Sequence, residues 1–352
     1  MTKIQASTSI RWQREVATAF DNLNELLVWL ELDEFALHDS LLSASLDAAQ
    51  DFPLRVPKDY AQRIEKGNPR DPLLLQILPR AQELDWTPGF VDDPVGDQNA
   101  QQDSGLLRKY SGRALLITTG ACAVHCRYCF RRNYPYQDSH ISVSDPQSTI
   151  AYIKENTDIN EVILSGGDPL SLSDRKLAPL MKQLDNIPHV KRLRIHTRTP
   201  IVLPNRIDQP FLDSLDNIHT PIVVVIHCNH PNELSTNVIE KLQQLRHSGV
   251  QLLNQSVLLR DINDNAQTLI QLSEQLFTAG VLPYYLHMLD PVTGTSHFEV
   301  DELTALELIS QLQQHLSGYL VPKLVREIPG ARSKIAVTEN SVLTCEQRNE
   351  EL

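Results

Sequence analysis

The sequence predicts an α/β protein whose parallel strands curl into a partial (β/α)6, TIM-like barrel. Six apolar, strand-like runs between residues 113 and 288 alternate with amphipathic helical stretches. Crossovers of this length join parallel strands through right-handed connections. Because strands and helices alternate regularly, we favour a curled, incomplete barrel over an open doubly wound sheet. A chain of 352 residues that is 41% hydrophobic can build the core that such a fold needs.

The chain before residue 105 is expected to be a helical N-terminal region. Helical periods at 12–20 and 23–32 precede turn-rich segments. Strands are then expected at 113–118, 161–166, 192–197, 221–227, 250–258 and 282–288, with helices such as 232–246 and 265–279 between them. We therefore divide the chain into an N-terminal helical region (1–104), a barrel core (105–320) and a C-terminal segment (321–352).

Charge and composition narrow the class of protein. A formal net charge of −12 argues against a nucleic-acid partner bound through a general basic surface. The N-terminus has no apolar signal core, and no apolar run is long enough to span a membrane. Three of the five cysteines share one short loop, which argues against a disulfide scaffold and for a reducing compartment. We expect a soluble, cytoplasmic protein.

The cysteine loop is the most informative motif. Cys122, Cys126 and Cys129 have the spacing CxxxCxxC. Three thiolates can hold three irons of a [4Fe-4S] cluster and leave the fourth iron open to a ligand, whereas clusters that only carry electrons usually have a fourth cysteine. Structural zinc is the alternative, but it normally needs four ligands in paired short spacings. His125 lies inside the loop, where it cannot easily complete a tetrahedron.

Polar residues follow most of the predicted strands. The carboxyl ends of parallel strands are the face on which such barrels build active sites, so these residues indicate one shared site. Each also has a structural alternative: a tight turn for the glycine pair, a satisfied core histidine for His227, and a surface ion pair for Arg198. The groups are the cysteine loop, Gly166-Gly167-Asp168-Pro169, Thr197-Arg198, His227 to His230 and His287 to Asp290; Asn254-Gln255-Ser256 lies within the fifth strand.

The cysteine loop after the first strand and the Gly-Gly-Asp-Pro turn after the second resemble the radical S-adenosylmethionine (SAM) superfamily. The resemblance implies that the open iron binds SAM and that an electron from the cluster cleaves it to a 5′-deoxyadenosyl radical. It also implies that Gly166, Gly167, His227 and Gln255 contact SAM. A backbone that must approach a ligand closely needs residues without side chains, which gives a physical reason for the two glycines.

Further motifs between residues 68 and 337, among them CRYCFRR, LSGGDPL, HTRTPIVLPNRI and PYYLHMLD, resemble the lysine 2,3-aminomutase family. That family uses pyridoxal 5′-phosphate (PLP). The resemblance implies that Lys334, in the run PGARSK, forms the aldimine with PLP, with Lys323 as the second candidate. Arg113 matches a residue that binds the PLP phosphate, and Lys109 occupies a neighbouring arginine position of the family.

The same resemblance implies L-lysine as the substrate. Arg131 would bind the α-carboxylate through its planar, bidentate guanidinium. Asp290 and Glu327 would receive the ε-ammonium group. Two carboxylates facing one ammonium favour lysine, because a site for an anionic side chain would not present two anions.

Within the family, the chain most resembles the branch linked to elongation factor P. The resemblance lies in the short tail, whose one cysteine is Cys345, and in the residues of several motifs. This implies an isomerase that makes (R)-β-lysine, which a separate ligase attaches to elongation factor P, and a reductant of the flavodoxin or ferredoxin type. Two alternatives stay open. One is an aminomutase of free lysine or another amino acid, and the other is a non-enzymatic, zinc-bound module.

Overall fold

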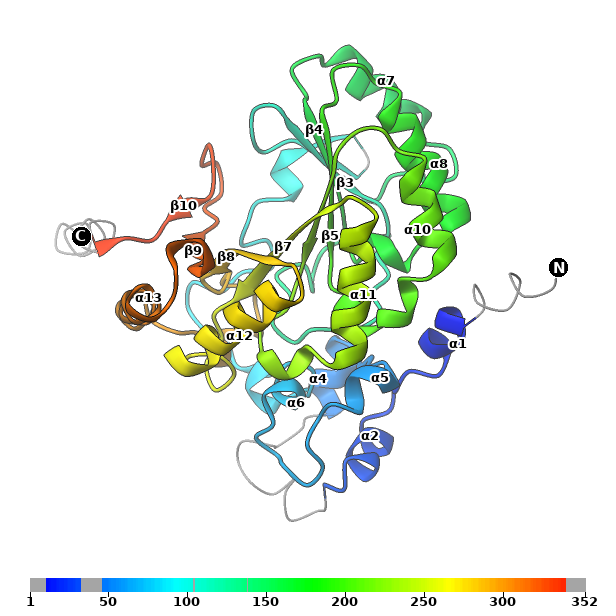
Figure 1. The fold of residues 1–352 in the computed structure, drawn as a ribbon. Coiled ribbons are helices and arrows are strands. Elements are labelled where there is room, and N and C mark those ends of the chain that lie inside the picture. The colour runs from blue at the N-terminus through cyan, green and yellow to red at the C-terminus, as the bar shows by residue number, and fades with distance from the viewer. Residues whose placement is uncertain (1–10, 33–45, 104, 138, 340–352) are drawn as a thin grey trace.

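A single sheet of ten strands, arranged in the order of the chain, organises the protein (Figure 1). The computed structural model describes residues 11–32, 46–103, 105–137 and 139–339. Seven strands run parallel: β3 (Arg113–Ile117), β4 (Glu161–Ser165), β5 (Arg192–Thr197), β6 (Ile222–Ile226), β7 (Gln251–Val257), β8 (Leu282–His287) and β9 (Lys323–Arg326). Antiparallel strands flank them: β1 (Gln101–Asp103) and β2 (Leu106–Leu107) before, and β10 (Ile335–Ala336) after.

The six predicted strands are confirmed as β3 to β8, and β9 adds a seventh parallel strand that the sequence did not reveal. In the described part of the chain β1 and β10 end the sheet without pairing with each other, so the barrel is incomplete, as predicted. The predicted fold class is therefore confirmed.

Burial along the strands shows which face of the sheet carries the site. All five residues of β4 are buried, as expected for a central parallel strand covered on both faces. In β5, buried residues alternate with partly exposed ones, and Arg194 and His196 are on the partly exposed face. Both of these residues line the large cavity described below. In β5 the inner face of the curved sheet is therefore polar, while the outer face is apolar.

Helices cover that outer face. The main ones are α7 (Gln147–Glu155), α8 (Asp174–Asp185), α10 (Gln209–Asp216), α11 (Thr236–His247), α12 (Ala266–Thr278) and α13 (Glu302–His315). Figure 1 shows α7, α8, α10 and α11 lying along one side of the sheet. In α8, Leu177, Leu180, Met181 and Leu184 are buried at helical spacing, which gives the helix one apolar face toward the strands.

The N-terminal region is a group of short helices at one end of the sheet (Figure 1). They are α1 (Arg11–Ala17), α2 (Leu23–Trp29), α4 (Leu46–Asp51), α5 (Lys58–Ala61) and α6 (Pro72–Leu75), followed by the 3-10 helix η1 (Ala81–Leu84). Leu26, Tyr60 and Leu73 are fully buried in the same apolar core as the strands. This region therefore packs as part of the barrel core.

The sheet continues across both predicted domain boundaries. The boundary after residue 104 lies between β1 and β2, and the boundary after residue 320 lies just before β9. The division into three segments stays a prediction about folding units. Cys345 lies outside the described residues. Among the helices of the described residues, none has the length and apolar character that crossing a bilayer requires.

Candidate active site

One cavity of about 480 Å³ is lined by every residue that the sequence predicted for the site. Its volume is in the range of small-molecule binding sites. Residues more than 200 positions apart in the chain therefore contribute to one chamber on the inner face of the sheet. The predicted residues that line it are Arg113, Cys122, Cys126, Cys129, Arg131, Gly166, Gly167, His227, Gln255, Asp290, Glu327 and Lys334.

The three cysteines of the loop are half-buried, free thiols. Burial raises the pKa of Cys122, and it raises the pKa of Cys129 to about 11. No group of three His, Cys, Asp or Glu side chains among the described residues is arranged to hold a single metal ion, so the zinc alternative gains no support. A four-iron cluster is wider than one ion, so its three sulfur ligands need not converge on a point. Three thiols on the wall of one cavity fit such a cluster.

The Gly-Gly-Asp turn packs directly against the start of the cysteine loop. A Cβ atom on Gly166 would lie 2.5 Å from the Thr119 carbonyl oxygen, and one on Gly167 would lie 2.5 Å from that of Ala121. The Gly167 N–H donates to Thr119 at 2.7 Å and the Asp168 N–H donates to Ala121 at 2.8 Å. The close approach that demands glycine in this structure is thus to the protein's own backbone. Contact of the two glycines with SAM stays a prediction.

The N-terminal region holds the cysteine loop from the other side. The buried Arg127 guanidinium makes two bonds to Glu83, 2.8 Å from Nε to Oε1 and 2.5 Å from Nη2 to Oε2. It also donates to the Phe52 carbonyl oxygen at 2.6 Å. The His125 N–H donates to the Arg55 carbonyl oxygen at 3.0 Å. Residues 52–83 therefore fix the backbone that carries the cysteines, a role that the sequence did not indicate.

Five residues form a row of alternating charge along the cavity, which we call the charge row. Asp97 binds Arg131 Nε and Lys109 Nζ, both at 2.6 Å. Lys109 Nζ also lies 2.9 Å from Glu327 Oε1, and Lys334 Nζ lies 2.5 Å from Glu327 Oε2. Arg131, Glu327 and Lys334 were predicted as site residues; Asp97 was missed because it ends a turn-rich segment with no recognisable motif. Lys109 acts here as a bridge between two carboxylates.

Two carboxyl groups of the cavity, Glu327 of the charge row and Asp290 beside it, have pKa values shifted in opposite directions. Burial alone would raise the pKa of Glu327, but Lys334 and Lys109 lower it to about 2. Burial and then the neighbouring Glu327 raise the pKa of Asp290 to about 7. No ion pair with Asp290 is found among the described residues. Asp290 is therefore a carboxyl group with capacity for an additional cation.

The proposed coenzyme residues lie in the same chamber. Arg113 begins β3, at the opposite end of that strand from the cysteine loop, so the cavity follows the length of the strand. Its guanidinium lies 3.8 Å from Glu161 and 5.5 Å from the centre of the Tyr110 ring. Lys323, the second candidate for the PLP lysine, is exposed at the start of β9 and does not line the cavity. Lys334 does line it, which favours Lys334.

Three histidines of the cavity wall keep a ring nitrogen without a partner. The Nε2 atoms of His196, His227 and His287 are buried and make no hydrogen bond within the described chain. Burial lowers the pKa of all three, that of His227 to about 3, so the rings are neutral. The core-histidine alternative for His227 is therefore wrong about Nε2, which is available to a ligand. From the sequence, His287 belonged to the group that ends the sixth predicted strand, without a specific role, and His196 was not singled out.

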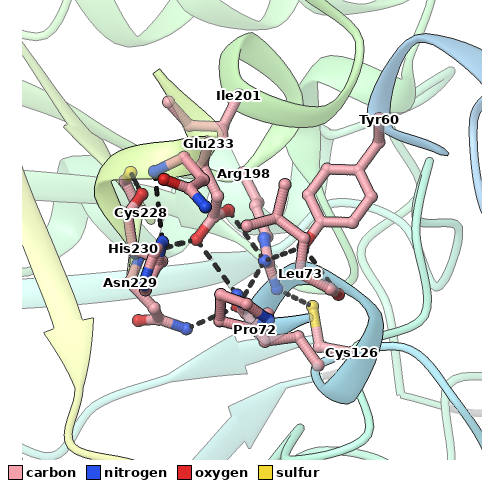
Figure 2. Close-up of polar contacts among 12 residues, drawn as sticks. Tyr60, Pro72, Leu73, Cys126, Arg198, Ile201, Cys228, Asn229, His230 and Glu233 are labelled. Atoms are coloured by element: carbon pink, nitrogen blue, oxygen red, sulfur yellow. Dashed lines mark hydrogen bonds and ion pairs between the residues drawn. The ribbon is translucent and has the colours of Figure 1, made fainter. Parts of the chain in front are cut away.

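Arg198 is buried rather than exposed (Figure 2). Its Nη2 lies 2.9 Å from Glu233 Oε2, and its backbone N–H donates to Asp168 Oδ2 at 2.8 Å. The surface alternative was right about an ion pair and wrong about the surface. Arg198 and Asp168 both line the cavity, so the turns after β4 and β5 are tied together at its edge.

Comparison with known proteins relates the chain to a family and to several curated relatives. The family model of the Radical SAM superfamily matches residues 116–272. The L-lysine 2,3-aminomutase of Escherichia coli (strain K12) is 46% identical over 323 residues, which cover 92% of this chain and 93% of that protein. The L-lysine 2,3-aminomutases of Haemophilus influenzae and Clostridium subterminale are 44% and 33% identical over 93% and 95% of this chain, and over 96% and 79% of their own lengths. Among solved structures, Streptococcus suis SuiB bound to S-adenosylmethionine aligns with a TM-score of 0.47 at 15% identity, over 64% of this chain and 52% of that one.

Proposed function

The chain belongs to the L-lysine 2,3-aminomutase family of radical SAM enzymes, and from this membership we propose that it converts L-α-lysine to (R)-β-lysine for the post-translational modification of elongation factor P. As an aminomutase it is an isomerase, an intramolecular aminotransferase. Membership of the radical SAM superfamily implies a [4Fe-4S] cluster and SAM. We propose PLP as a further cofactor. The observation that supports the proposal best is the single cavity shared by the cysteine loop, the charge row and Lys334.

At one end of the cavity, Cys122, Cys126 and Cys129 would hold the cluster. Gly166, Gly167, His227 and Gln255 would contact SAM. When bound, the cluster and SAM supply a radical able to remove hydrogen from an unactivated carbon. The chain's contribution is to fix the cysteine loop from both sides and to keep bulk water away from the radical, and the burial of the loop supports this role.

Farther along the chamber, Lys334 would bind PLP covalently and Arg113 would bind its phosphate. Lys334 reaches the cavity with its Nζ on Glu327, so the amine is already directed into the chamber. The neutral rings of His196 and His287 line the same space and can donate or accept one hydrogen bond each without adding charge.

The charge row supports a zwitterionic diamino acid as substrate. Asp97 binds Nε of Arg131 and Ser165 Oγ binds its Nη1 at 3.1 Å, while Nη2 makes no bond within the described residues. Two of the three guanidinium nitrogens are thus held by the protein, and the third suits the α-carboxylate. Glu327 already binds an alkylammonium, that of Lys334, at 2.5 Å. The ε-ammonium of lysine would occupy a position of this kind, with Asp290 as its second carboxylate.

The test is anaerobic reconstitution with iron, sulfide, PLP and SAM, reduction by a flavodoxin- or ferredoxin-type donor, and chiral analysis of the product from L-lysine. We expect (R)-β-lysine, and transfer of that product to elongation factor P once the separate β-lysine ligase is added. The other enantiomer, or a product that the ligase does not attach to elongation factor P, would favour the alternative, an aminomutase of free amino-acid metabolism. Full iron loading without any cleavage of SAM would contradict the radical mechanism itself.

A further inference from the structure

A buried polar cluster lies against the cysteine loop, and Arg198 is at its centre (Figure 2). Arg198 Nη2 donates to Gln76 Oε1 at 2.7 Å and pairs with Glu233 Oε2 at 2.9 Å. The side chain of Arg198 is 6% exposed and that of Glu233 is not exposed. Asn229 joins them through its side-chain amide, which donates to Gln76 at 3.0 Å. We call these four residues, with Tyr128, the Arg198 cluster.

The Arg198 cluster touches one of the three cysteines. Arg198 Nη1 lies 2.7 Å from Cys126 Sγ, and the same nitrogen bonds the Tyr128 hydroxyl. Within the described residues, neither Cys122 nor Cys129 receives a hydrogen bond from a side chain. Among the described residues, the cysteine loop therefore places one sulfur in direct contact with a buried guanidinium, whereas the other two sulfurs accept no hydrogen bond from a cationic side chain.

We propose that Arg198 is a positioning residue for the [4Fe-4S] cluster. By donating a hydrogen bond from its guanidinium to the Cys126 sulfur, Arg198 also sets the reduction potential of the iron–sulfur cluster. The proposal rests on the iron–sulfur cluster that is assigned to the cysteine loop under the proposed function. Reduction of a cluster adds one negative charge, and hydrogen bonds to its sulfurs are among the factors that set its potential. A cation in direct contact with a ligand sulfur, in a medium of low dielectric constant, stabilises the reduced form more than the oxidised one.

Glu233, the ion-pair partner of Arg198, should affect the reduction potential in the opposite direction. Its Oε1 accepts hydrogen bonds from the backbone N–H groups of Asn229 at 2.9 Å and His230 at 3.0 Å. These bonds fix the carboxylate in the position from which it pairs with Arg198. An unpaired guanidinium would be costly to bury, so Glu233 holds Arg198 in place. Its negative charge also offsets part of the positive field at Cys126. Loss of the cation and loss of the anion should therefore shift the potential in opposite directions.

The experiment uses the full chain carrying Arg198→Gln or Glu233→Gln, reconstituted anaerobically with iron and sulfide, with the midpoint potential measured by redox titration followed by EPR. For Arg198→Gln we expect a more negative potential, such that the reduced-to-oxidised ratio at a fixed potential falls about tenfold, which is about 59 mV for one electron. For Glu233→Gln we expect a shift to a more positive potential. A purely structural role would not give opposite signs.

The matched control is Arg206→Gln. Arg206 is as buried as Arg198 and pairs with Asp174 at 2.7 Å, but it has no contact with a cysteine. Its variant should lose stability and leave the potential unchanged. An unchanged potential in Arg198→Gln, or a shift equal to that of Arg206→Gln, would overturn the proposal.

Iron and sulfide content is measured first, because a wild-type chain that takes up no cluster would refute the cluster assignment rather than the role of Arg198. If Arg198→Gln cannot retain a cluster, Glu233→Gln decides the question: a positive shift supports the proposal, and no shift or a negative one refutes it. Arg198→Lys, which keeps the charge, should recover part of the wild-type potential.

Discussion

Two carboxyl groups in the cavity differ in charge because their neighbours differ. Glu327 lies between two lysine ammonium groups, which lower its pKa to about 2. Burial and the neighbouring Glu327 carboxylate both disfavour ionisation of Asp290, and they raise its pKa to about 7. A pair whose pKa values are pushed apart in this way is typical of functional sites. Asp290 is thus the group of the site whose charge changes near neutral pH.

We expect kcat/KM for lysine to rise with pH through about 7. Below that pH Asp290 is protonated and binds an ammonium weakly; above it the carboxylate is charged and binds well. Asp290→Asn should remove this inflection and lower kcat/KM on the order of 100-fold, the cost of losing one buried charge partner. Glu327→Gln is the control: it should also lower kcat/KM, but it should move the inflection to lower pH and not remove it, because Glu327 stays ionised near pH 7 and its charge raises the pKa of Asp290. A profile of Asp290→Asn that still bends near 7 would contradict the assignment.

Lys334→Ala should abolish the absorbance of covalently bound PLP while leaving the iron–sulfur spectrum intact. Lys334 and the cysteines line the same cavity but belong to different segments of the chain, so loss of the lysine amine should leave the cysteine loop unchanged. Lys323→Ala is a matched control, because Lys323 is exposed and does not line the cavity. Absorbance spectroscopy of the two variants after PLP loading decides between them. Loss of the signal in Lys323→Ala alone would reassign the coenzyme lysine.

At the scale of elements, strands were predictable where the chain had apolar runs, and were missed where it did not. The strands β3 to β8 each contain such a run, and their positions were expected. Strand β9 was missed because its four residues, KLVR, have a charge at both ends and too short an apolar centre to form a pattern. Its place in the sheet depends on pairing with β8, which is a tertiary contact.

The site residues that belong to recognisable motifs were predicted from the sequence. Asp97 and Glu233, the ion-pair partner of Arg198, were not. Glu233 is 35 positions from Arg198, and no local spacing indicates that the two side chains meet. Asp97 is 34 positions from Arg131. Ion pairs between distant segments are decided by the fold, so the sequence identified the chemistry of the site better than its supporting contacts.

Gly167→Ala should displace the cysteine loop. Its new Cβ would lie 2.5 Å from the Ala121 carbonyl oxygen, so backbone must move, at a cost of about 1–3 kcal/mol in the free energy of unfolding. Gly318→Ala is the matched control, since a Cβ there meets nothing within 4 Å. Urea unfolding and iron content after reconstitution measure the two effects. Full iron loading and unchanged stability in Gly167→Ala would show that the loop does not depend on this contact.

At the scale of the whole molecule, the N-terminal region does more than cover one end of the barrel. The buried pair of Arg127 and Glu83 joins residues of that region to the cysteine loop, and Gln76 enters the Arg198 cluster. Segments that a sequence-based division would assign to separate units therefore share one site. The cysteine loop should lose its shape if the region is loosened.

Glu83→Ala should lower the free energy of unfolding by about 3–5 kcal/mol, because it leaves the Arg127 guanidinium buried without its carboxylate. Glu31→Ala breaks the exposed pair with Lys66 and should cost less than about 1 kcal/mol. Both are measured by urea unfolding of the cofactor-free chain. Equal effects of the two substitutions would contradict the importance of the buried pair. Iron uptake by Glu83→Ala should fall as well.

The charge row has an odd number of members, three cations and two anions, so it cannot be electrically neutral. An incoming diamino acid brings one carboxylate and two ammonium groups, so it adds one further positive charge. Loss of the Asp290 proton offsets that added charge. Occupation of the chamber by a diamino acid near pH 7 should therefore release protons to the solvent, with a stoichiometry that depends on the buffer pH and an enthalpy that depends on the buffer chosen.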